Sequence, residues 1–365
     1  MTTTIGIVGG GQLARMLALA GIPLGLRFVI LDPAPDAGAA VASEHICQAY
    51  DDLVALNELA ERCDVITYEF ENIPASAMAH LAAKVPVHPA PEALAISRDR
   101  LTEKNLFREL GIELPPYFTV DSRADLEAAV AKTGLPAVLK TRTLGYDGKG
   151  QFVLRAHANL DTAWKTLGSV PLILEGFVPF DREISIVAAR SIGGEICYWL
   201  ISENSHQGGI LRLARSQPDD PFTRQAQGYV KRILERLQYV GVMALELFCV
   251  GDRLLANEMA PRVHNSGHWT IEGAETSQFE NHVRAVAGLP LGSTASVGHA
   301  AMVNFIGAAP IPSEVLELTD VHLHDYGKTP RAGRKVGHAT VHGVDAVRFE
   351  AQLARLRVLA DAVAC

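Results

Sequence analysis

The 365-residue chain contains few cysteines, and none of them is spaced as a Cys-x-x-Cys pair. The five are odd in number and scattered, at Cys47, Cys63, Cys197, Cys249 and Cys365. This pattern argues against a disulfide framework and against a zinc site built from cysteine pairs. We therefore expect reduced thiols, as in a cytoplasmic enzyme.

Long apolar runs are also missing. No stretch approaches the ~20 apolar residues that a membrane-spanning helix requires, so we expect no membrane association. Residues 1–4 lead directly into an apolar strand, without the basic and apolar regions of a signal peptide. We therefore expect a cytoplasmic protein.

Positive charge is in deficit. Lys and Arg number 33 against 41 Asp and Glu, for a net charge of −8. A nucleic-acid-binding protein needs a basic face, so we expect no nucleic-acid partner, although a local basic pocket for one phosphate remains compatible. Apolar residues at 48% and charged residues at 20% are ordinary for a globular protein, and the length allows two or three domains.

Strands alternate with helices in the first part of the chain, which predicts an α/β, Rossmann-like domain with a parallel sheet. The expected strands are 5–8, 28–31 and 65–67, and the expected helices are 12–20 and 52–62. The proline-rich stretch 86–91 indicates a boundary. We expect three domains: 1–97, a mixed α+β domain over 98–290, and a small β-rich C-terminal domain over 291–365.

In the second section we expect helices near 99–110, 124–132 and 225–237, with a final helix at 346–362 in the third. Strand-like runs are expected at 137–140, 151–154, 172–175, 183–189, 198–201, 243–250 and 253–259. The last two runs are joined at Gly251-Asp252, a plausible hairpin turn.

A glycine-rich turn follows the first expected strand. Gly9–Ala14 fits G-x-G-x-x-A, and Asp32 ends the next strand roughly 20 residues later, which matches a dinucleotide-binding fingerprint. Two other interpretations remain open here. A tight strand-to-helix turn needs glycines in any case, and the helix N-terminus could bind another anion.

A second glycine-rich loop, Gly145–Gln151, follows a strand that ends on Lys140. Its three glycines allow backbone N–H groups to point at phosphate oxygens, and the lysine can reach a phosphate as a point charge. The loop is not a Walker A motif, because G-x-x-x-x-G-K-[ST] does not occur. The alternative is a simple glycine-rich hairpin with solvated charges.

Two glutamates lie inside apolar strands. A hairpin through Gly251-Asp252 would place Glu246 roughly opposite Glu258. Buried carboxylates need a cation or donor, and two of them beside Asn257 provide the oxygen ligands that Mg²⁺ prefers. The alternative is a structural ion pair between Glu246 and an arginine.

Two histidines four residues apart, His264 and His268, could mimic a zinc pair on a helix. We favour a loop instead, because Asn265-Ser266-Gly267 lies between them and no third ligand is evident. His322 and His324 alternate on an expected strand.

Taken together, these residues resemble the ATP-grasp superfamily and, more narrowly, the N5-carboxyaminoimidazole ribonucleotide synthetase family. The superfamily marks are Lys140, the loop GYDGKGQ, EGFV at 175–178, DRE at 181–183 and the pair Glu246 and Glu258. The narrower marks are GGGQLARM, YEFENIP at 68–74, NEMAPRVHNSGHWT at 257–270, and YGK with RAGRKVGH at 326–338. The departures are small, with Ala14 and Ala332 standing where the family often has Gly and Pro.

The resemblance implies an ATP-grasp fold and a carbon–nitrogen ligase. The family joins bicarbonate to 5-aminoimidazole ribonucleotide in purine biosynthesis, converting ATP to ADP and phosphate through carboxyphosphate. It also implies Mg²⁺ as cofactor and a homodimer.

The resemblance carries site residues over by position. ATP would be bound by Arg100, Lys140, Gly145, Tyr146, Asp147, Gly148, Lys149, Gly150, Gln151, Glu175, Gly176, Phe177, Val178, Glu183, His206, Asn257 and Glu258. The metal would be held by Glu246 and Glu258. The catalytic candidates are Arg262, Asp147 and Lys140. Substrate would be bound by Gln12, Leu13, Glu71, Asp147, Arg262, His264, Lys328, Arg331, Arg334 and Lys335.

Chemistry supports several of these roles. The guanidinium fork of Arg262 matches a planar oxyanion such as bicarbonate, and four cations between Lys328 and Lys335 suit a loop around a phosphate. Two other functions remain to be weighed, a formate-dependent glycinamide ribonucleotide transformylase and an NAD-dependent oxidoreductase. The oxidoreductase leaves the glutamate pair and the second glycine loop without a role. A catalytically silent paralogue would be expected to have lost some of Lys140, Glu246, Glu258 or Arg262, but all four are present. A biotin carboxylase is disfavoured because no Ala-Met-Lys-Met carrier motif is present.

Overall fold

A parallel sheet forms the N-terminal part of the protein, as the sequence predicts. The computed structural model describes residues 2–145 and 150–364. The strands lie in the order β3-β2-β1-β4 and span Thr4–Val8 (β1), Arg27–Leu31 (β2), Glu44–Ile46 (β3) and Val65–Tyr68 (β4). They are flanked by α1 (Gln12–Gly21), α2 (Leu53–Arg62), α3 (Ala75–Ala82), α4 (Pro91–Ser97) and the short 3-10 helices η1 (Ile22–Leu24) and η2 (Gly38–Val41). Ile7 and Val8 point to opposite faces of the sheet and are both fully buried, as expected of a parallel strand covered on both faces.

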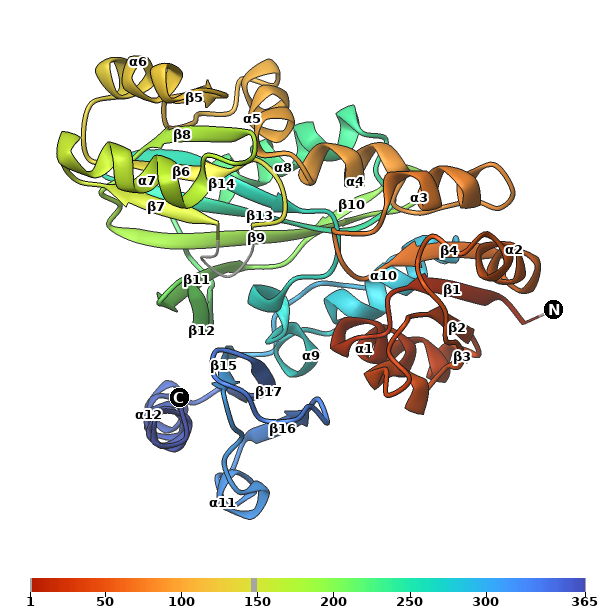
Figure 1. Ribbon diagram of the computed structural model, residues 1–365. Helices are drawn as coiled ribbons and strands as arrows, with labels where there is room; N and C mark the ends of the chain where they lie inside the picture. Colours follow the sequence, from red (N-terminus) through yellow and green to blue (C-terminus); the bar gives the residue numbers. More distant parts are fainter. Residues whose placement is uncertain (1, 146–149, 365) are drawn as a thin grey trace.

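A small antiparallel sheet forms a separate lobe, at the upper left of Figure 1. Its strand order is β5-β8-β6-β7, with β5 at Tyr117–Val120, β6 at Ala137–Thr141, β7 at Gln151–Leu154 and β8 at Leu172–Gly176. The helices of this lobe are α6 (Arg123–Thr133), η3 (His157–Asn159) and α7 (Leu160–Leu167). Leu126 of α6 and Ala163 of α7 share one buried core with Leu139 and Leu174 of the sheet, so both helices pack on the sheet.

A large antiparallel sheet forms the body of the protein. Its path is β14-β13-β9-β11-β12-β15-β17-β16, with β10 paired to β9. The strands span Arg182–Arg190 (β9), Ile196–Tyr198 (β10), Ile201–Gln207 (β11), Ile210–Gln217 (β12), Gly241–Val250 (β13), Arg253–Ala260 (β14), His299–Ile306 (β15), Val321–Asp325 (β16) and Lys335–Gly343 (β17). Because β12 pairs with β15, the C-terminal strands extend the large sheet.

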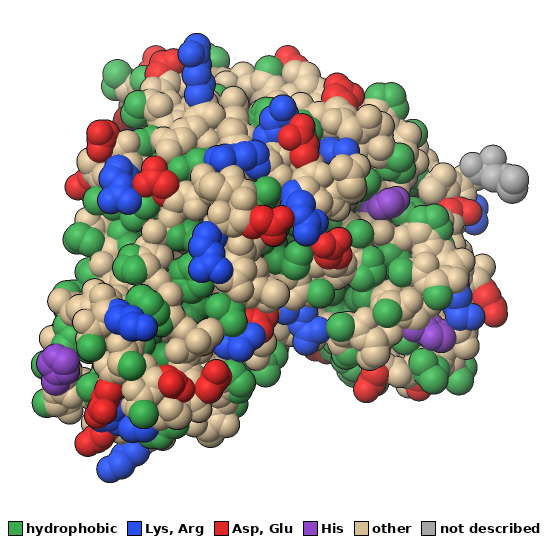
Figure 2. All heavy atoms as spheres, turned by 90° about the horizontal axis from the view of Figure 1, so that it is seen from above, with side chains coloured by type: hydrophobic (Ala, Val, Ile, Leu, Met, Phe, Trp, Pro, Cys, Tyr) green, Lys and Arg blue, Asp and Glu red, His purple; other side chains and the backbone are tan. Residues whose placement is uncertain are grey.

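The remaining helices all contact the large sheet. They are α5 (Arg100–Glu109), α8 (Thr223–Arg236), η4 (Asn265–Gly267), α9 (Thr270–Gly273), α10 (Gln278–Val286), α11 (Pro312–Leu316) and α12 (Ala346–Ala362). α10 lies beside α1 and packs against β13, so it connects the N-terminal sheet to the large one (Figure 1). Figure 2 shows acidic and basic side chains interspersed over the face that it presents. No helix in the described part of the chain is long and apolar enough to cross a membrane.

One expected strand is wrong. Residues 198–201 do not form a continuous strand, since β10 ends at Tyr198 and β11 begins at Ile201. Trp199 lies between them, buried, and its Nε1 donates to the carbonyl oxygen of Thr276 at 2.9 Å. This long-range hydrogen bond holds Trp199 outside both strands, whereas the local apolar pattern predicts one continuous strand. The sequence analysis also did not anticipate β12, α3 or α10.

Candidate active site

A cavity of about 960 Å³ lies where the three sheets meet. Its walls include nearly all the described residues that the sequence singled out as site residues. Gly150 is the exception, because it does not line the cavity. Tyr146, Asp147, Gly148 and Lys149 lie outside the described residues.

The first glycine motif binds the protein's own carboxylates. Gly10 N–H donates to Asp32 Oδ2 at 2.8 Å, and Ala14 N–H donates to Glu69 Oε2 at 3.0 Å. Gly11 N–H also donates to Glu69. A Cβ added at Gly11 would lie 2.6 Å from Glu69 Oε1, so glycine is needed for this close approach. The N-terminus of α1 is therefore occupied by Glu69, where a dinucleotide enzyme would place a pyrophosphate.

The two glutamates of the hairpin face each other. Glu246 of β13 pairs with Glu258 of β14. The two-residue turn pairs Val250 with Arg253, and continuing that register would place Asn257 opposite Glu246. A β-bulge next to Glu246 shifts the register by one residue and brings Glu258 into place.

The pKa values of the two glutamates shift in opposite directions. Burial, reinforced by the charge of Glu258, raises the pKa of Glu246 to about 7. Burial also acts on Glu258, but Arg100 and Lys140 outweigh it and lower the pKa of that carboxyl. Arg100 Nη1 lies 3.0 Å from Glu258 Oε2. Glu246 lies 3.5 Å from the Nε2 of His264, so its partner is not an arginine.

Helix α5 contributes two buried ionisable side chains that the sequence analysis missed. Lys104 is 1% exposed, and its Nζ lies 3.4 Å from Glu175 Oε2 of the small sheet. The same Nζ donates to the carbonyl oxygen of Asn257 on the large sheet at 3.2 Å. Glu103 accepts from the backbone N–H of Met259 at 2.7 Å, and burial raises its pKa to about 8. The only signal in the sequence was charge at adjacent positions of an amphipathic helix.

Lys140 and Lys104 share one carboxylate. Lys140 Nζ donates to Glu175 Oε2 at 2.9 Å. Burial opposes ionisation of Glu175, but Lys104 and Lys140 together lower its pKa to about 2. Glu175 thus neutralises two buried ammonium groups at the inner end of the small sheet, while the segment that follows it, 176–178, lines the cavity.

A histidine–carboxylate pair lies across β9 and β11. His206 Nδ1 is 2.5 Å from Glu183 Oε2. Burial disfavours the charged imidazole, but the hydrogen bond to Glu183 raises the pKa of His206. Both residues line the cavity. The aromatic rings of Phe180 and Phe248 stack nearby at 4.9 Å between centroids and line the same space.

Arg262 connects the body to the N-terminal domain. Its Nη2 lies 2.9 Å from Glu71 Oε1, and its Nη1 donates to the carbonyl oxygen of Val263 at 3.0 Å. The guanidinium and its partner Glu71 both line the cavity. Glu71 therefore orients Arg262. The substrate contact that the resemblance assigns to Glu71 stays a prediction.

The segment after Arg262 is held by buried polar contacts. Ser185 Oγ donates to Ser266 Oγ at 2.7 Å, and Ser202 Oγ donates to the carbonyl oxygen of Ser266 at 2.9 Å. Trp269 Nε1 donates to Ser202 Oγ at 2.7 Å. His264 and His268 flank the 3-10 turn η4, so they do not share an α-helix. The segment is therefore a rigid, irregular wall of the cavity.

Four C-terminal cations line the cavity, three on the loop between β16 and β17 and one at the start of β17. They are Lys328, Arg331, Arg334 and Lys335. Gly333 in this loop has φ +71°, a backbone conformation that favours glycine. Lys328 donates to Gln12 at the start of α1, and burial, together with Arg334, lowers the pKa of this lysine to about 8. Two segments far apart in the sequence thus form one basic wall.

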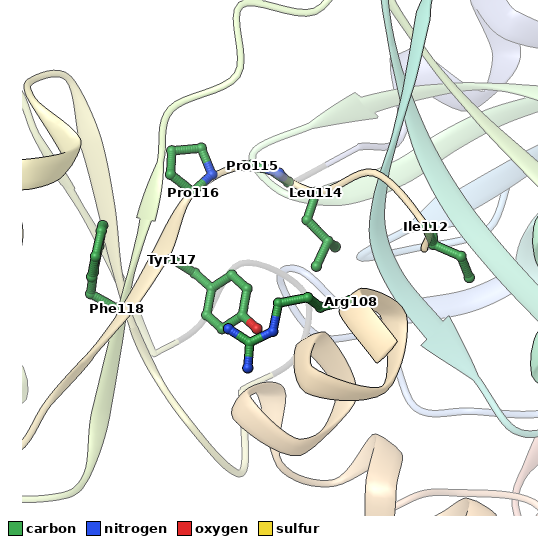
Figure 3. A pocket seen from close by; sticks show the side chains of 7 residues that line it. All are labelled: Arg108, Ile112, Leu114, Pro115, Pro116, Tyr117 and Phe118. Carbon is green, nitrogen blue, oxygen red and sulfur yellow. The ribbon is translucent and has the colours of Figure 1, made fainter. Parts of the chain in front are cut away.

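A smaller hollow of about 370 Å³ lies outside this site, beside the chain that enters the small sheet (Figure 3). The Arg108 guanidinium lies over the Tyr117 ring at 5.6 Å. Both side chains donate to Asn105 Oδ1 at 2.9 Å. Pro115 lines both this hollow and the large cavity. None of the residues that the sequence singled out lines the hollow.

Comparisons with known proteins define the class of the fold as an ATP-grasp ligase. The ATP-grasp domain model matches residues 105–279, the ribonucleotide synthetase preATP-grasp domain matches 1–98, and the phosphoribosylaminoimidazole carboxylase C-terminal domain matches 300–352. The N5-carboxyaminoimidazole ribonucleotide synthase of Pseudomonas aeruginosa is 57% identical over 358 residues, covering 98% of this chain and 99% of the relative. The chain therefore belongs to the N5-carboxyaminoimidazole ribonucleotide synthase family.

Solved structures agree. The crystal structure of the synthetase from Thermus thermophilus superposes with a TM-score of 0.93 at 52% identity, covering 97% of this chain and 98% of that one. The synthase from Aspergillus clavatus, in complex with ADP and 5-aminoimidazole ribonucleotide, superposes with a TM-score of 0.91 at 26% identity, covering 99% of each chain. These comparisons confirm the resemblance and the fold class expected from the sequence.

Proposed function

We propose that this chain carboxylates 5-aminoimidazole ribonucleotide with bicarbonate, giving N5-carboxyaminoimidazole ribonucleotide, ADP and phosphate in purine biosynthesis. One observation carries the proposal. A single cavity is lined by a facing glutamate pair with Lys140 and Arg100 and also by Arg262 and the basic loop. Such a site would suit a nucleoside triphosphate beside a second phosphorylated ligand.

The nucleotide would lie between the small and large sheets. Lys140 and Arg100 supply positive charge for its phosphates, and the segment 175–178 offers backbone groups to the adenine. Glu183, held by His206, would accept hydrogen bonds from ribose hydroxyls. Glu175 pairs with both Lys104 and Lys140. Because Lys104 also neutralises Glu175, Lys140 is not its sole counter-charge.

The residues present fit a divalent cation. Two partly buried carboxylates face each other, and burial together with the charge of Glu258 raises the pKa of Glu246 to about 7. Glu246 and Glu258 would hold Mg²⁺, with Asn257 adjacent. When bound, the ion would neutralise charge on the phosphate oxygens. Among the described residues, no group of three or more His, Cys, Asp or Glu is arranged to hold a metal, so substrate phosphates and water would complete its coordination.

The proposed carboxylation has two steps. A bicarbonate oxygen attacks the γ-phosphorus of ATP and ADP leaves, which forms carboxyphosphate. The exocyclic amine then attacks the carbonyl carbon, phosphate leaves, and the amine loses a proton. Arg262, oriented by Glu71, would bind the bicarbonate and the carboxyphosphate through its planar fork. Asp147, assigned by resemblance to the amine, lies outside the described residues.

The ribonucleotide would bind against the C-terminal wall. Its phosphate would meet the cations of the loop 328–335, and Gln12, which accepts from Lys328, joins that wall to the N-terminal domain. We also expect a cytoplasmic homodimer, as the family resemblance implies. Analytical ultracentrifugation tests the homodimer.

An ADP-release assay tests the activity. We expect release with ATP, Mg²⁺ and bicarbonate to increase strongly when 5-aminoimidazole ribonucleotide is added. The same assay with formate and glycinamide ribonucleotide tests the transformylase alternative, and NADH absorbance with candidate alcohols tests the oxidoreductase. A rate of ADP release that does not depend on the aminoimidazole ribonucleotide would contradict the proposal. The carboxylates of Asp32 and Glu69 on the first glycine motif already argue against a dinucleotide there.

A further inference from the structure

Gln278, the first residue of α10, binds the wall segment 264–268 with its side-chain amide. Its Oε1 accepts from the backbone N–H of His264 at 2.9 Å, and its Nε2 donates to the carbonyl oxygen of the same residue at 2.6 Å. A backbone N–H can only donate and a carbonyl can only accept, so these two bonds fix which end of the amide is nitrogen. Gln278 is fully buried, which makes the arrangement costly to break.

The same amide determines where His268 carries its proton. Gln278 Nε2 lies 3.1 Å from His268 Nδ1. Because Nε2 of the amide has a second hydrogen and no lone pair, Nδ1 of the imidazole must accept. Burial lowers the pKa of His268 to about 3, so the ring is neutral near pH 7. Its single ring proton is therefore on Nε2.

Gly267 allows this contact. A Cβ at that position would lie 2.9 Å from Cδ and Oε1 of Gln278. The amide group of a glutamine is usually mobile. Here its oxygen and its nitrogen are both hydrogen-bonded, so the amide cannot move aside without breaking these bonds. The glycine and the glutamine act together to hold the turn.

The imidazole of His268 lines the cavity although the residue is only 1% exposed. Its ring packs against His338 at 5.0 Å and Phe279 at 5.2 Å between centroids. With Nδ1 committed to Gln278, Nε2–H is the polar group that the ring can present to a ligand. Arg262 and Lys335 line the same cavity and both carry positive charge, so the ligand on this wall is expected to be anionic.

We propose that His268 is a ligand-binding residue whose Nε2–H donates to an anionic oxygen of a substrate, and that Gln278 is the positioning residue that imposes this tautomer. The same geometry disfavours zinc at His268. Metal binding at Nε2 would move the proton to Nδ1, where it would face the N–H of Gln278. The identity of the ligand rests on the proposed function, whereas the tautomer does not.

The ligand oxygen has two possible sources, the carboxyl group of bicarbonate and the phosphate of the ribonucleotide. His268→Phe keeps the ring volume and removes the donor. His268→Gln is its matched control, because a glutamine amide can place a donor where Nε2 lies. We expect His268→Phe to raise the KM of one of these two substrates about tenfold, the loss of one hydrogen bond to a charged group. The KM of ATP should change less than about twofold, and His268→Gln should recover most of the loss.

The pattern of KM values identifies the source. A rise confined to bicarbonate assigns the donor to the carboxyl group, and a rise confined to the ribonucleotide assigns it to the phosphate. Unchanged values for both, or equal rises for all three substrates, would overturn the proposal. A wild type in which ADP release depends on the ribonucleotide shows beforehand that the proposed function holds.

Nuclear magnetic resonance tests the tautomer without any substrate. In the full chain labelled with ¹⁵N-histidine, we expect His268 Nε2 to be protonated and Nδ1 unprotonated. Gln278→Glu, which offers only acceptors, should move the proton to Nδ1 and reproduce the KM change of His268→Phe. Gly267→Ala should shift the same resonances. An unprotonated Nε2 in the wild type would sink the proposal even if a variant failed to fold.

Discussion

Glu246 lies opposite Glu258 on the neighbouring strand, and the β-bulge beside Glu246 produces this pairing. The two-residue turn alone would have placed Asn257 there. The two carboxylates differ in pKa because Arg100 reaches Glu258 and lowers its pKa, while burial and the charge of Glu258 raise the pKa of Glu246 to about 7. A divalent cation would favour the ionised form of both.

Glu258→Gln should therefore abolish ATP turnover. The substitution removes one of two oxygen ligands and leaves Arg100 without its 3.0 Å partner. We expect a loss of at least about a hundredfold in kcat, the scale of removing an electrostatic group from a phosphoryl-transfer site. The ADP-release assay measures it, with the exposed Glu61→Gln as control. A Glu258→Gln variant that keeps a near-normal rate would exclude the metal assignment.

Lys335→Ala should weaken ribonucleotide binding more than ATP binding. Lys335 begins β17 and lines the cavity with the other cations of the loop. Loss of one charge-assisted contact should raise the KM of the ribonucleotide about tenfold or more, and the KM of ATP by less than about threefold. Steady-state kinetics with each substrate varied in turn provides the measurement. Equal effects on both substrates would contradict a phosphate pocket at this wall.

Lys104→Met should destabilise the protein and raise the KM of ATP. Its ammonium group links Glu175 of the small sheet to Asn257 of the large one, and breaking a buried pair by removing one partner costs about 3–5 kcal/mol. Urea denaturation gives the free energy of unfolding. In a double-mutant cycle, Lys104→Met with Glu175→Gln should recover part of the stability but not the ATP affinity. Strictly additive stability losses would show that the two residues do not interact.

His282→Asn should flatten the acid limb of the stability profile. His282 Nδ1 accepts from Val242 N–H at 3.1 Å, and Nε2 is 2.9 Å from Thr67 Oγ1, so the ring joins α10, β13 and β4. Burial lowers the pKa of His282 to about 3, below its ordinary value of 6.5. The unfolded chain then binds more protons between these values. Stability is present above pH 6.5 and is lost as the pH falls toward 3.

Denaturant unfolding at pH 7 and pH 5 tests this effect. An asparagine can offer Oδ1 where Nδ1 lies, so the variant should lose about 1–2 kcal/mol at pH 7 but show a smaller decline toward pH 5. His322→Asn is the control, because His322 is exposed. Identical pH slopes for wild type and His282→Asn would mean that another group dominates acid unfolding.

Local features of the chain were predictable from the sequence. The turn at Gly251-Asp252 was expected, and β13 and β14 pair around it. The last helix spans 346–362 as expected, and the parallel N-terminal sheet follows from alternating strands and helices. Each of these depends on contacts between residues close in sequence, or on a periodicity that one segment carries alone. Among the described residues, the site residues that resemblance marked also line one cavity, except Gly150, although their segments lie far apart in the sequence.

What the sequence determined by itself, then, was the class of the fold, the glutamate pair and the basic loop. Only the tertiary structure decided that Glu69 occupies the first glycine motif, that Lys104 joins two sheets, and that Gln278 sets the tautomer of His268. Glu69 reaches Ala14 across 55 residues, and Lys104 reaches Asn257 across 153. No local pattern specifies such partners, because a buried polar group is satisfied by whichever donor or acceptor the packed core brings to it.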